Sequence, residues 1–205
     1  MSIYELKPRF QALLRPAVQR LARAGVTANQ VTVAACVVSV TLGLWLFFAA
    51  PGRWAFALLP LWMLLRMALN AVDGMLAREF GQQSRLGAYL NELCDVIADA
   101  ALYLSLLSVP GVRPEALWLL AWAAALSEYA GVLGLMVGAS RRYDGPMGKS
   151  DRAFVIGVLG LLLAFGWAGA TVVSAVAALA ALLCGMTVVR RVRQGLKEAA
   201  AISQR

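Results

Sequence analysis

Two long stretches without a charged residue limit what this chain can fold into. No Asp, Glu, Lys or Arg occurs over residues 31–50 or over residues 153–189. A helix of about 20 apolar residues crosses the hydrocarbon core of a bilayer. Hydrophobic residues make up 61% of the chain and charged residues 15%, whereas soluble domains have roughly 45–50% and about 25%. These features predict a membrane protein.

The apolar stretches predict six spans. The stretch 153–189 is too long for one helix, and the segment from Gly166 to Gly169 provides a break near its middle. Three further spans are expected over residues 54–77, 86–109 and 116–139. The predicted fold class is an all-α membrane protein with six transmembrane helices. Residues 29–195 would form the six-span bundle, within a single domain over residues 1–205.

Lysine and arginine are unevenly distributed between the two ends of these spans. Sixteen of the 19 lie ahead of the first span, between spans two and three, between spans four and five, or after span six. Arg53 and Arg113 lie at the other end, and Arg66 lies within span two. Cytoplasmic segments carry the excess of positive charge, so both termini are predicted to be cytoplasmic. This topology accounts for most of the net charge of +8, and no nucleic-acid partner is expected.

The segment 1–24, ahead of the first span, is amphipathic. Apolar residues recur in it at helical spacing, and basic residues occupy the rest of the wheel. The pattern predicts an interfacial helix lying in the headgroup layer of the bilayer. Pro8 and Pro16 are expected to limit or kink this helix.

The chain contains no histidine. This excludes Ser–His and Cys–His nucleophile pairs, histidine metal sites and imidazole proton shuttles. Acid–base chemistry would therefore use Asp, Glu, Lys, Tyr or Cys. The three cysteines, Cys36, Cys94 and Cys184, are scattered through apolar stretches and are interpreted as small apolar side chains rather than as a disulfide or metal framework.

Polar side chains, which are costly in hydrocarbon, cluster in spans two and three. They are Arg66, Asn70 and Asp73 in span two and Asn91, Glu92, Asp95 and Asp99 in span three. The spacings Asn70 to Asp73 and Asn91 to Asp95 place each pair on one helix face, and a short loop allows the two faces to meet. Carboxylates without histidine or thiolate favour Mg²⁺, Mn²⁺ or Ca²⁺. Glu128, in span four, is expected to neutralise Arg66.

The spacing of these residues resembles the signature of the CDP-alcohol phosphatidyltransferases. The run Asp73-Gly74-x2-Ala77-Arg78-x8-Gly87-x3-Asn91-x3-Asp95 fits that pattern with no gap, and residues 27–32, Thr-Ala-Asn-Gln-Val-Thr, resemble a second family segment. The resemblance implies transfer of a phosphatidyl group from CDP-diacylglycerol to the hydroxyl of a small polar alcohol, with release of CMP. It also implies a homodimer in the lipid bilayer of a bacterial inner (plasma) membrane, with the active site on the cytoplasmic side.

The resemblance also implies roles for individual residues. Asp95 would be the general base and a metal ligand, Asp73 would be a metal ligand, and Mg²⁺ or Mn²⁺ would be the cofactor. The CDP-lipid would be bound by Asn29, Thr32, Gly74, Ala77, Arg78, Ser84 and Gly87.

Two positions depart from the family pattern. Asn70 and Asn91 stand where the family has aspartates, and although an amide oxygen can still bind a metal ion, it carries no charge. This leaves three possibilities: a catalyst that uses one metal or a different ion, a two-metal site with neutral ligands, or a protein that binds CDP-lipid without turnover. We favour a working enzyme.

The loop between spans four and five is rich in cations. Its basic residues, Arg141, Arg142, Lys149 and Arg152, are expected to bind the phosphate of an acceptor, for which glycerol 3-phosphate is the first choice. Alternatively, these charges serve the positive-inside topology and bind anionic headgroups. A small-solute transporter is a further alternative, but it would show repeated halves or paired interrupted helices.

Overall fold

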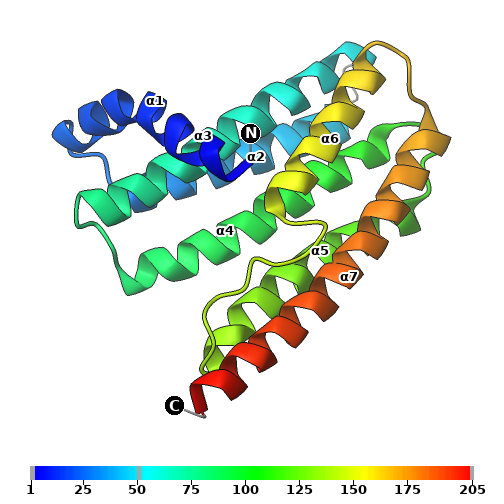
Figure 1. Ribbon diagram of the computed structural model, residues 1–205. Helices are drawn as coiled ribbons and strands as arrows, with labels where there is room; N and C mark the ends of the chain where they lie inside the picture. The colour runs from blue at the N-terminus through cyan, green and yellow to red at the C-terminus, as the bar shows by residue number, and fades with distance from the viewer. Residues whose placement is uncertain (1–2, 50–51, 204–205) are drawn as a thin grey trace.

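The computed structural model describes residues 3–49 and 52–203, and this part of the chain is entirely α-helix, short 3₁₀ turns and connecting loops (Figure 1). The α-helices are α1 (Ile3–Arg23), α2 (Ala28–Ala49), α3 (Leu58–Glu79), α4 (Arg85–Leu104), α5 (Pro114–Leu133), α6 (Lys149–Ala164) and α7 (Ala170–Ser203). The 3₁₀ turns are η1 (Arg53–Ala57), η2 (Ser105–Ser108) and η3 (Gly134–Val137). The predicted all-α class is confirmed.

Four of the described helical segments are long and apolar enough to cross a membrane: Ala28–Ala49, Arg53–Glu79, Pro114–Val137 and Ala170–Ser203. The other two helices predicted as spans, α4 and α6, are more polar or shorter than these four. Helix α4 carries Glu92, Asp95 and Asp99 along its length, and α6 has only 16 residues and begins with charged side chains. Six spans therefore stay a prediction.

The break predicted within the long uncharged stretch lies between α6 and α7. Helix α6 ends at Ala164, and α7 begins at Ala170. Gly166 has a φ of +73°, and a Cβ there would lie 2.7 Å from Nη1 of Arg53. Because a left-handed backbone and this close approach both favour glycine, the turn depends on Gly166.

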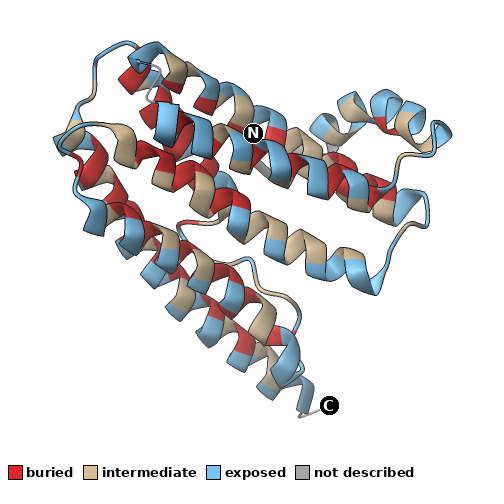
Figure 2. Ribbon diagram, turned by 180° about the vertical axis from the view of Figure 1, so that it is seen from behind, coloured by how far each residue is buried: buried red, intermediate tan, exposed pale blue. Residues whose placement is uncertain are grey.

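The helices pack as three principal pairs. Helix α2 lies against α4, α3 against α6, and α5 against α7 (Figures 1 and 2). A Cβ on Gly43 would lie 2.5 Å from the carbonyl oxygen of Ala101. Small residues of this kind allow membrane helices to approach closely. This packing holds α4 against α2. Helix α4 carries Asn91, Glu92, Asp95 and Asp99.

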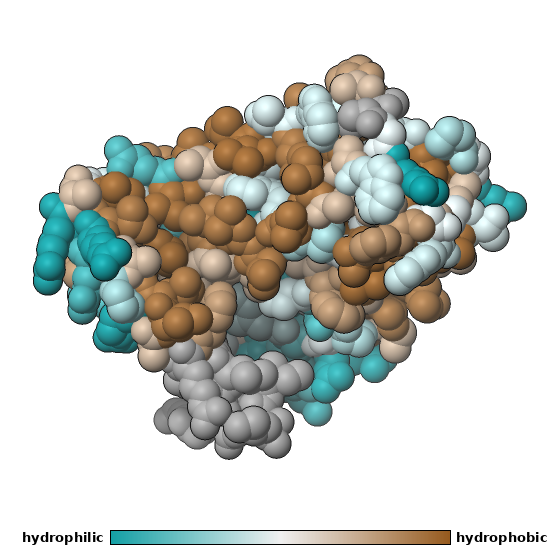
Figure 3. Space-filling model, turned by 90° about the horizontal axis from the view of Figure 1, so that it is seen from above, coloured by the Kyte–Doolittle hydropathy of each residue, from teal (hydrophilic) through white to brown (hydrophobic). Residues whose placement is uncertain are grey.

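The surface is apolar where lipid is expected. Figure 3 shows apolar side chains over the middle of one face and hydrophilic side chains toward its two ends. Large hydrophobic residues such as Leu61, Leu64 and Leu182 are more than 60% exposed. A broad apolar surface is expected of a protein surrounded by lipid and marks an interaction surface.

Helix α1 packs across α3. Val18 is fully buried and contacts a cluster that includes Val72, Met75 and Leu76 of α3, and Arg15 forms an exposed ion pair of 3.0 Å with Glu79. The helix continues through Pro8 and Pro16, so of the two predicted effects, a limit or a kink, the limit is wrong. Pro16 lies on the exposed side of α1, away from the residues that attach the helix to α3.

Candidate active site

A cavity of about 1020 Å³ lies between α2, α3, α4, α5 and the loop that follows α5. Its two parts differ in character. One part is lined by polar residues of α2, α3 and the α3–α4 turn, and the other by Leu93, Val96 and Ile97 of α4 together with Tyr129 and Val132 of α5. Leu93, Ile97 and Tyr129 are each more than half exposed. The cavity therefore joins a polar recess to an apolar surface between α4 and α5.

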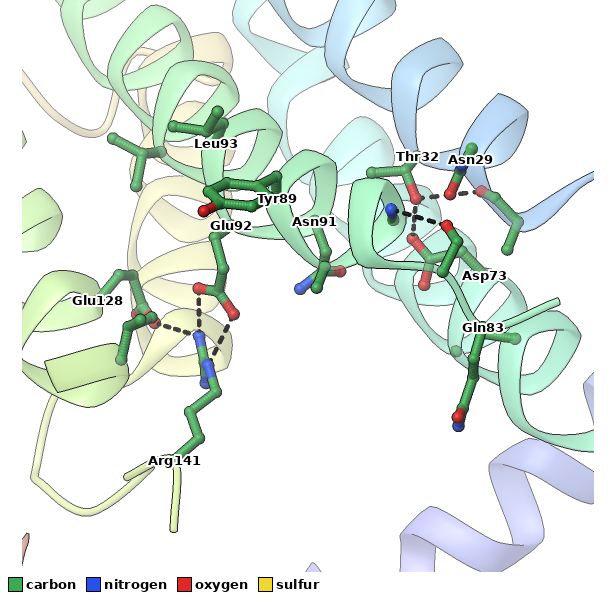
Figure 4. A pocket seen from close by; sticks show the side chains of 18 of the residues that line it. Asn29, Thr32, Asp73, Gln83, Tyr89, Asn91, Glu92, Leu93, Glu128 and Arg141 are labelled. Carbon is green, nitrogen blue, oxygen red and sulfur yellow. Dashed lines mark hydrogen bonds and ion pairs between the residues drawn. The ribbon is translucent and has the colours of Figure 1, made fainter. Parts of the chain in front are cut away.

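Asp73 lies in the polar part of the cavity. Its Oδ2 accepts a hydrogen bond of 2.7 Å from Oγ1 of Thr32 in α2, and the residue is only 5% exposed. Figure 4 shows Asn29, Thr32 and Asp73 grouped at one side of the cavity, with Asn91 between this group and Glu92. The structure thus brings together three of the predicted ligand-binding residues from two helices.

Gly87 and Ser84 form the start of α4 at the edge of the cavity. Oγ of Ser84 caps the helix by accepting a hydrogen bond of 2.9 Å from the Gly87 N–H. A Cβ on Gly87 would lie 2.7 Å from Oδ1 of Asn29 and 3.0 Å from Oγ of Ser84. The missing side chain therefore leaves room for the amide of Asn29. The predicted CDP-lipid residues Asn29, Thr32, Gly74, Ala77, Arg78, Ser84 and Gly87 all line the cavity.

Asp95 lies one turn along α4 from Asn91, beside the cavity lining rather than in it. Its Oδ2 forms an ion pair with Nζ of Lys149, and its Oδ1 lies 3.4 Å from Nη2 of Arg66. The Asp95 side chain is 14% exposed and that of Lys149 21%. The predicted base is thus adjacent to two cations from α3 and α6.

A chain of buried ion pairs continues inward from Asp95. Arg66 also pairs with Asp99, and Nη2 of Arg152 lies 3.1 Å from Oδ2 of Asp99 and 2.9 Å from Oε1 of Glu128. The expectation that Arg66 and Glu128 neutralise each other is therefore wrong. Asp99 faces Arg66 directly, and Arg152 separates Asp99 from Glu128.

Arg141 lies across the cavity from Asp73. Its Nε and Nη2 donate to the two carboxylate oxygens of Glu92 at 2.7 and 2.6 Å, and Nη2 lies 3.3 Å from Glu128 (Figure 4). The guanidinium also stacks over the ring of Tyr143 at 4.3 Å. Burial favours the neutral form, but the hydrogen bonds and charge of Glu92 outweigh it and raise the pKa of Arg141 above its usual range. Arg141 therefore stays a cation.

The four cations predicted to bind an acceptor lie in different surroundings. Arg141 lines the cavity, and Lys149 is adjacent to Asp95. Arg142 pairs with Asp144 and with Glu198 of α7. Arg152 is 1% exposed and also donates to Ser127 and the carbonyl oxygen of Met147. The structure thus brings two of the four to the site.

The donors suit a divalent ion that is held together with substrate phosphates. Asp73 and Asp95 supply carboxylates, and Mg²⁺ is commonly bound through one or two carboxylates plus substrate phosphate oxygens. Within residues 3–49 and 52–203, no group of three or more acidic, His or Cys side chains is arranged to hold a metal ion. Nδ2 of Asn70 is buried and finds no hydrogen-bond partner in this part of the chain. An amide N–H group donates hydrogen bonds and does not bind a metal ion, and Asn70 is not among the residues that line the cavity.

Sequence reasoning missed several residues of the cavity wall. Gln82 accepts a hydrogen bond of 2.7 Å from the N–H of Ala28 and donates to the carbonyl oxygen of Val26 at 3.3 Å. It attaches the α3–α4 turn to the start of α2, and no periodicity or motif marks it. Gln83 and Tyr89 also line the cavity, but their positions follow from the turn that begins α4.

The comparisons with known proteins agree with this geometry. A family model described as CDP-alcohol phosphatidyltransferase matches residues 25–191. The chain is 48% identical over 164 residues to inner membrane protein YnbA of Escherichia coli (strain K12), covering 80% of this chain and 81% of that protein. It is 30% identical over 148 residues to archaetidylinositol phosphate synthase of Aeropyrum pernix, covering 67% of this chain and 74% of the relative.

Solved structures share the fold. Crystal structures of phosphatidylinositol phosphate synthase from Mycobacterium tuberculosis, one with manganese and citrate and one with CDP-DAG bound, each match with a TM-score of 0.72 at 24% identity. They cover 88% of this chain and 88% and 92% of the solved chains. The chain therefore belongs to the CDP-alcohol phosphatidyltransferase family, whose members are divalent-metal-dependent membrane enzymes of phospholipid biosynthesis.

Proposed function

We propose that the protein transfers the phosphatidyl group of CDP-diacylglycerol to the hydroxyl of a small polar alcohol and releases CMP. One observation carries the proposal: a single cavity joins a polar recess around Asp73 to an apolar surface between α4 and α5. This combination suits a ligand with a charged diphosphate head and apolar tails. Family membership supports the same reaction.

In this reaction, the acceptor hydroxyl oxygen forms a bond to the β-phosphorus of the CDP-lipid. The bond between that phosphorus and the bridging oxygen breaks, and CMP leaves with the bridging oxygen. Asp95 accepts the hydroxyl proton as general base, and Arg66 and Lys149 lie against its two carboxylate oxygens. Asp73 is the carboxylate on the cavity wall that would hold a divalent ion, and such an ion would supply positive charge to the diphosphate and to the leaving CMP.

The cytidine and diphosphate would lie along the α2 and α3 side of the cavity. Asn29 and Thr32 present polar atoms there, and Arg78 supplies a cation on the cavity wall. A Cβ on Gly74 would lie 2.9 Å from Nη2 of Arg78, so the bare backbone at Gly74 leaves room for that guanidinium. These contacts support assignment of this side to the nucleotide end of the substrate.

The direct test is turnover in liposomes. Purified protein is reconstituted with CDP-diacylglycerol and Mn²⁺ or Mg²⁺, and CMP and lipid mass are followed with glycerol 3-phosphate, inositol phosphate, glycerol, serine and inositol as acceptors. We expect CMP and one new phospholipid, both lost on chelation of the ion or omission of the acceptor. If CDP-diacylglycerol binds but neither CMP nor a new lipid forms, the chain is a binding protein and the proposal is wrong.

We propose a phosphorylated acceptor, with glycerol 3-phosphate as the first choice. The support is Arg141, a cation on the cavity wall whose forked guanidinium suits the oxygens of a phosphate. The similar proteins from Aeropyrum pernix and Mycobacterium tuberculosis are named as inositol phosphate lipid synthases, so inositol phosphate is compared directly.

Replacement of Arg141 by glutamine tests this acceptor assignment. Loss of one charge-assisted contact to phosphate corresponds to about 1.5–3 kcal/mol, so we expect KM for the phosphorylated acceptor to rise roughly tenfold or more. KM for CDP-diacylglycerol is expected to change little. Arg193→Gln, on the exposed face of α7, is the matched control. Equal rises in both KM values would show that Arg141 supports the whole cavity rather than the acceptor.

We also propose the topology that the charges indicate: α2 to α7 each cross the membrane, α1 lies at the interface, and the site faces the cytoplasm. The support is that the α3–α4 turn, the α5–α6 loop and the end of α7 lie toward one end of the bundle, at the lower left of Figure 1. Cysteine labelling from each side of sealed vesicles tests this orientation. The homodimer implied by the family resemblance is tested by the mass of the purified protein.

A further inference from the structure

Lys149 is the first residue of α6 and lies against the predicted base. The N–H of Gly148 donates a 2.9 Å hydrogen bond to the Asp151 carboxylate, which fixes the start of the helix. From this position Nζ of Lys149 reaches Oδ2 of Asp95. The ammonium is therefore held beside Asp95 by a capped helix end rather than by a mobile loop.

Both carboxylate oxygens of Asp95 face cations. Lys149 pairs with Oδ2, and Arg66 lies 3.4 Å from Oδ1 while also donating to the Asp95 carbonyl oxygen at 3.1 Å. Arg66 is 3% exposed and is held by its pairing with Asp99. A carboxylate in contact with two cations has little remaining attraction for a divalent ion.

The surroundings of the Asp73 carboxylate differ from those of Asp95. Thr32 donates a neutral hydrogen bond to its Oδ2, and the side chain lines the cavity. No cation forms an ion pair with Asp73 among the described residues. Of the two carboxylates of the predicted metal set, only Asp73 is therefore available to a metal ion in this arrangement.

The charged side chains around the cavity carry a small excess of positive charge. The acidic side chains of the cavity and the adjoining ion pairs are Asp73, Glu92, Asp95, Asp99 and Glu128. The basic ones are Arg66, Arg78, Arg141, Lys149, Arg152 and Arg191. Because cations outnumber acids, the negative charge needed to hold a divalent ion comes from the ligand's own diphosphate.

We propose that the Lys149 ammonium takes the place of a divalent ion at Asp95. The site then binds one divalent ion, at Asp73, and binds it only together with a nucleotide diphosphate. This rests on the proposed function for the identity of the ligand. Lys149 is a positioning residue in this scheme: it sets how many ions bind and in what order.

Mn²⁺ binding tests the proposal without turnover. The purified full-length protein is titrated with Mn²⁺ alone and with Mn²⁺ in the presence of CDP, and free Mn²⁺ is measured by electron paramagnetic resonance. For the unaltered protein we expect negligible binding of Mn²⁺ alone, and one ion per chain with CDP. Lys149→Gln is expected to increase the affinity for Mn²⁺ alone at least tenfold, whereas Lys149→Arg, which keeps the charge, is expected to leave it unchanged.

A second variant keeps the test informative if Lys149→Gln does not fold. Asn91→Asp adds a carboxylate to the cavity wall and is expected to increase binding of Mn²⁺ alone without removal of any native contact of Lys149. Two Mn²⁺ ions per chain in the unaltered protein without CDP, or an unchanged affinity in both Lys149→Gln and Asn91→Asp, would overturn the proposal. A negative result in the liposome assay, by contrast, concerns turnover and leaves the ion stoichiometry measurable.

Discussion

Replacement of Asp95 by asparagine is expected to lower the rate of CMP release by about 10²–10⁴-fold, the usual contribution of a positioned general base. The substitution keeps the shape of the side chain but removes the group that accepts the hydroxyl proton. It also leaves Lys149 and Arg66 without one carboxylate partner. The measurement is the initial rate of CMP release in liposomes at saturating CDP-diacylglycerol and acceptor.

Glu79→Gln is the matched control for this prediction. Glu79 is the last residue of α3, and it forms an exposed ion pair of 3.0 Å with Arg15. Exposed pairs contribute about 0–1 kcal/mol, so we expect this variant to keep its activity. If Asp95→Asn keeps more than a tenth of the rate, another group accepts the proton and the role assigned to Asp95 is wrong.

Replacement of Arg152 by methionine is expected to destabilise the protein by about 3 kcal/mol, the lower end of the range for removal of one partner from a buried ion pair. The loss is at the lower end because Asp99 keeps Arg66, and Glu128 keeps Arg141 and Arg191. Arg152 is 1% exposed and pairs with Asp99 of α4 and Glu128 of α5. In a domain of this size, such a loss corresponds to a fall in Tm of roughly 10 °C. Thermal unfolding in detergent, followed by tryptophan fluorescence, measures it.

A double variant identifies the cause of this loss. Asp99→Asn added to Arg152→Met removes one of the two carboxylates that lose the Arg152 contact, so the combined loss is expected to be smaller than the sum of the single losses. Arg193→Met, at an exposed position of α7, is the control for loss of a surface cation. Additive losses would mean that Arg152 stabilises the protein through its packing rather than through Asp99.

The sequence allowed much of the fold to be predicted because hydrophobic length and helix breakers are local signals. The break at Gly166 and the polar faces of α3 and α4 follow from composition and spacing within one segment. The prediction that the N-terminal prolines limit the first helix was wrong. Residues such as Val18 pack α1 against α3, and this contact stabilises the helix through Pro16. That tertiary support is not visible in a single helix.

The candidate site was predictable to the same extent. The residues that line the polar recess, such as Asp73 and Gly87, belong to one spaced motif. The partners of the buried charges come from helices distant in the sequence: Arg66 meets Asp99 of α4, and Glu128 meets Arg152 of α6. A one-dimensional pattern shows that such charges need partners, but helix packing decides which ones they find.

The apolar opening between α4 and α5 affects how a lipid substrate reaches the cavity. Leu93 and Ile97 line the cavity and are also exposed at the side of the bundle. A lipid substrate reaches such an opening by lateral diffusion within one leaflet, and its product leaves by the same route. With the proposed substrate, the rate is expected to depend on the mole fraction of CDP-diacylglycerol in that leaflet and not on its amount per volume of solution. Dilution with inert phospholipid is then expected to slow the reaction at constant bulk concentration.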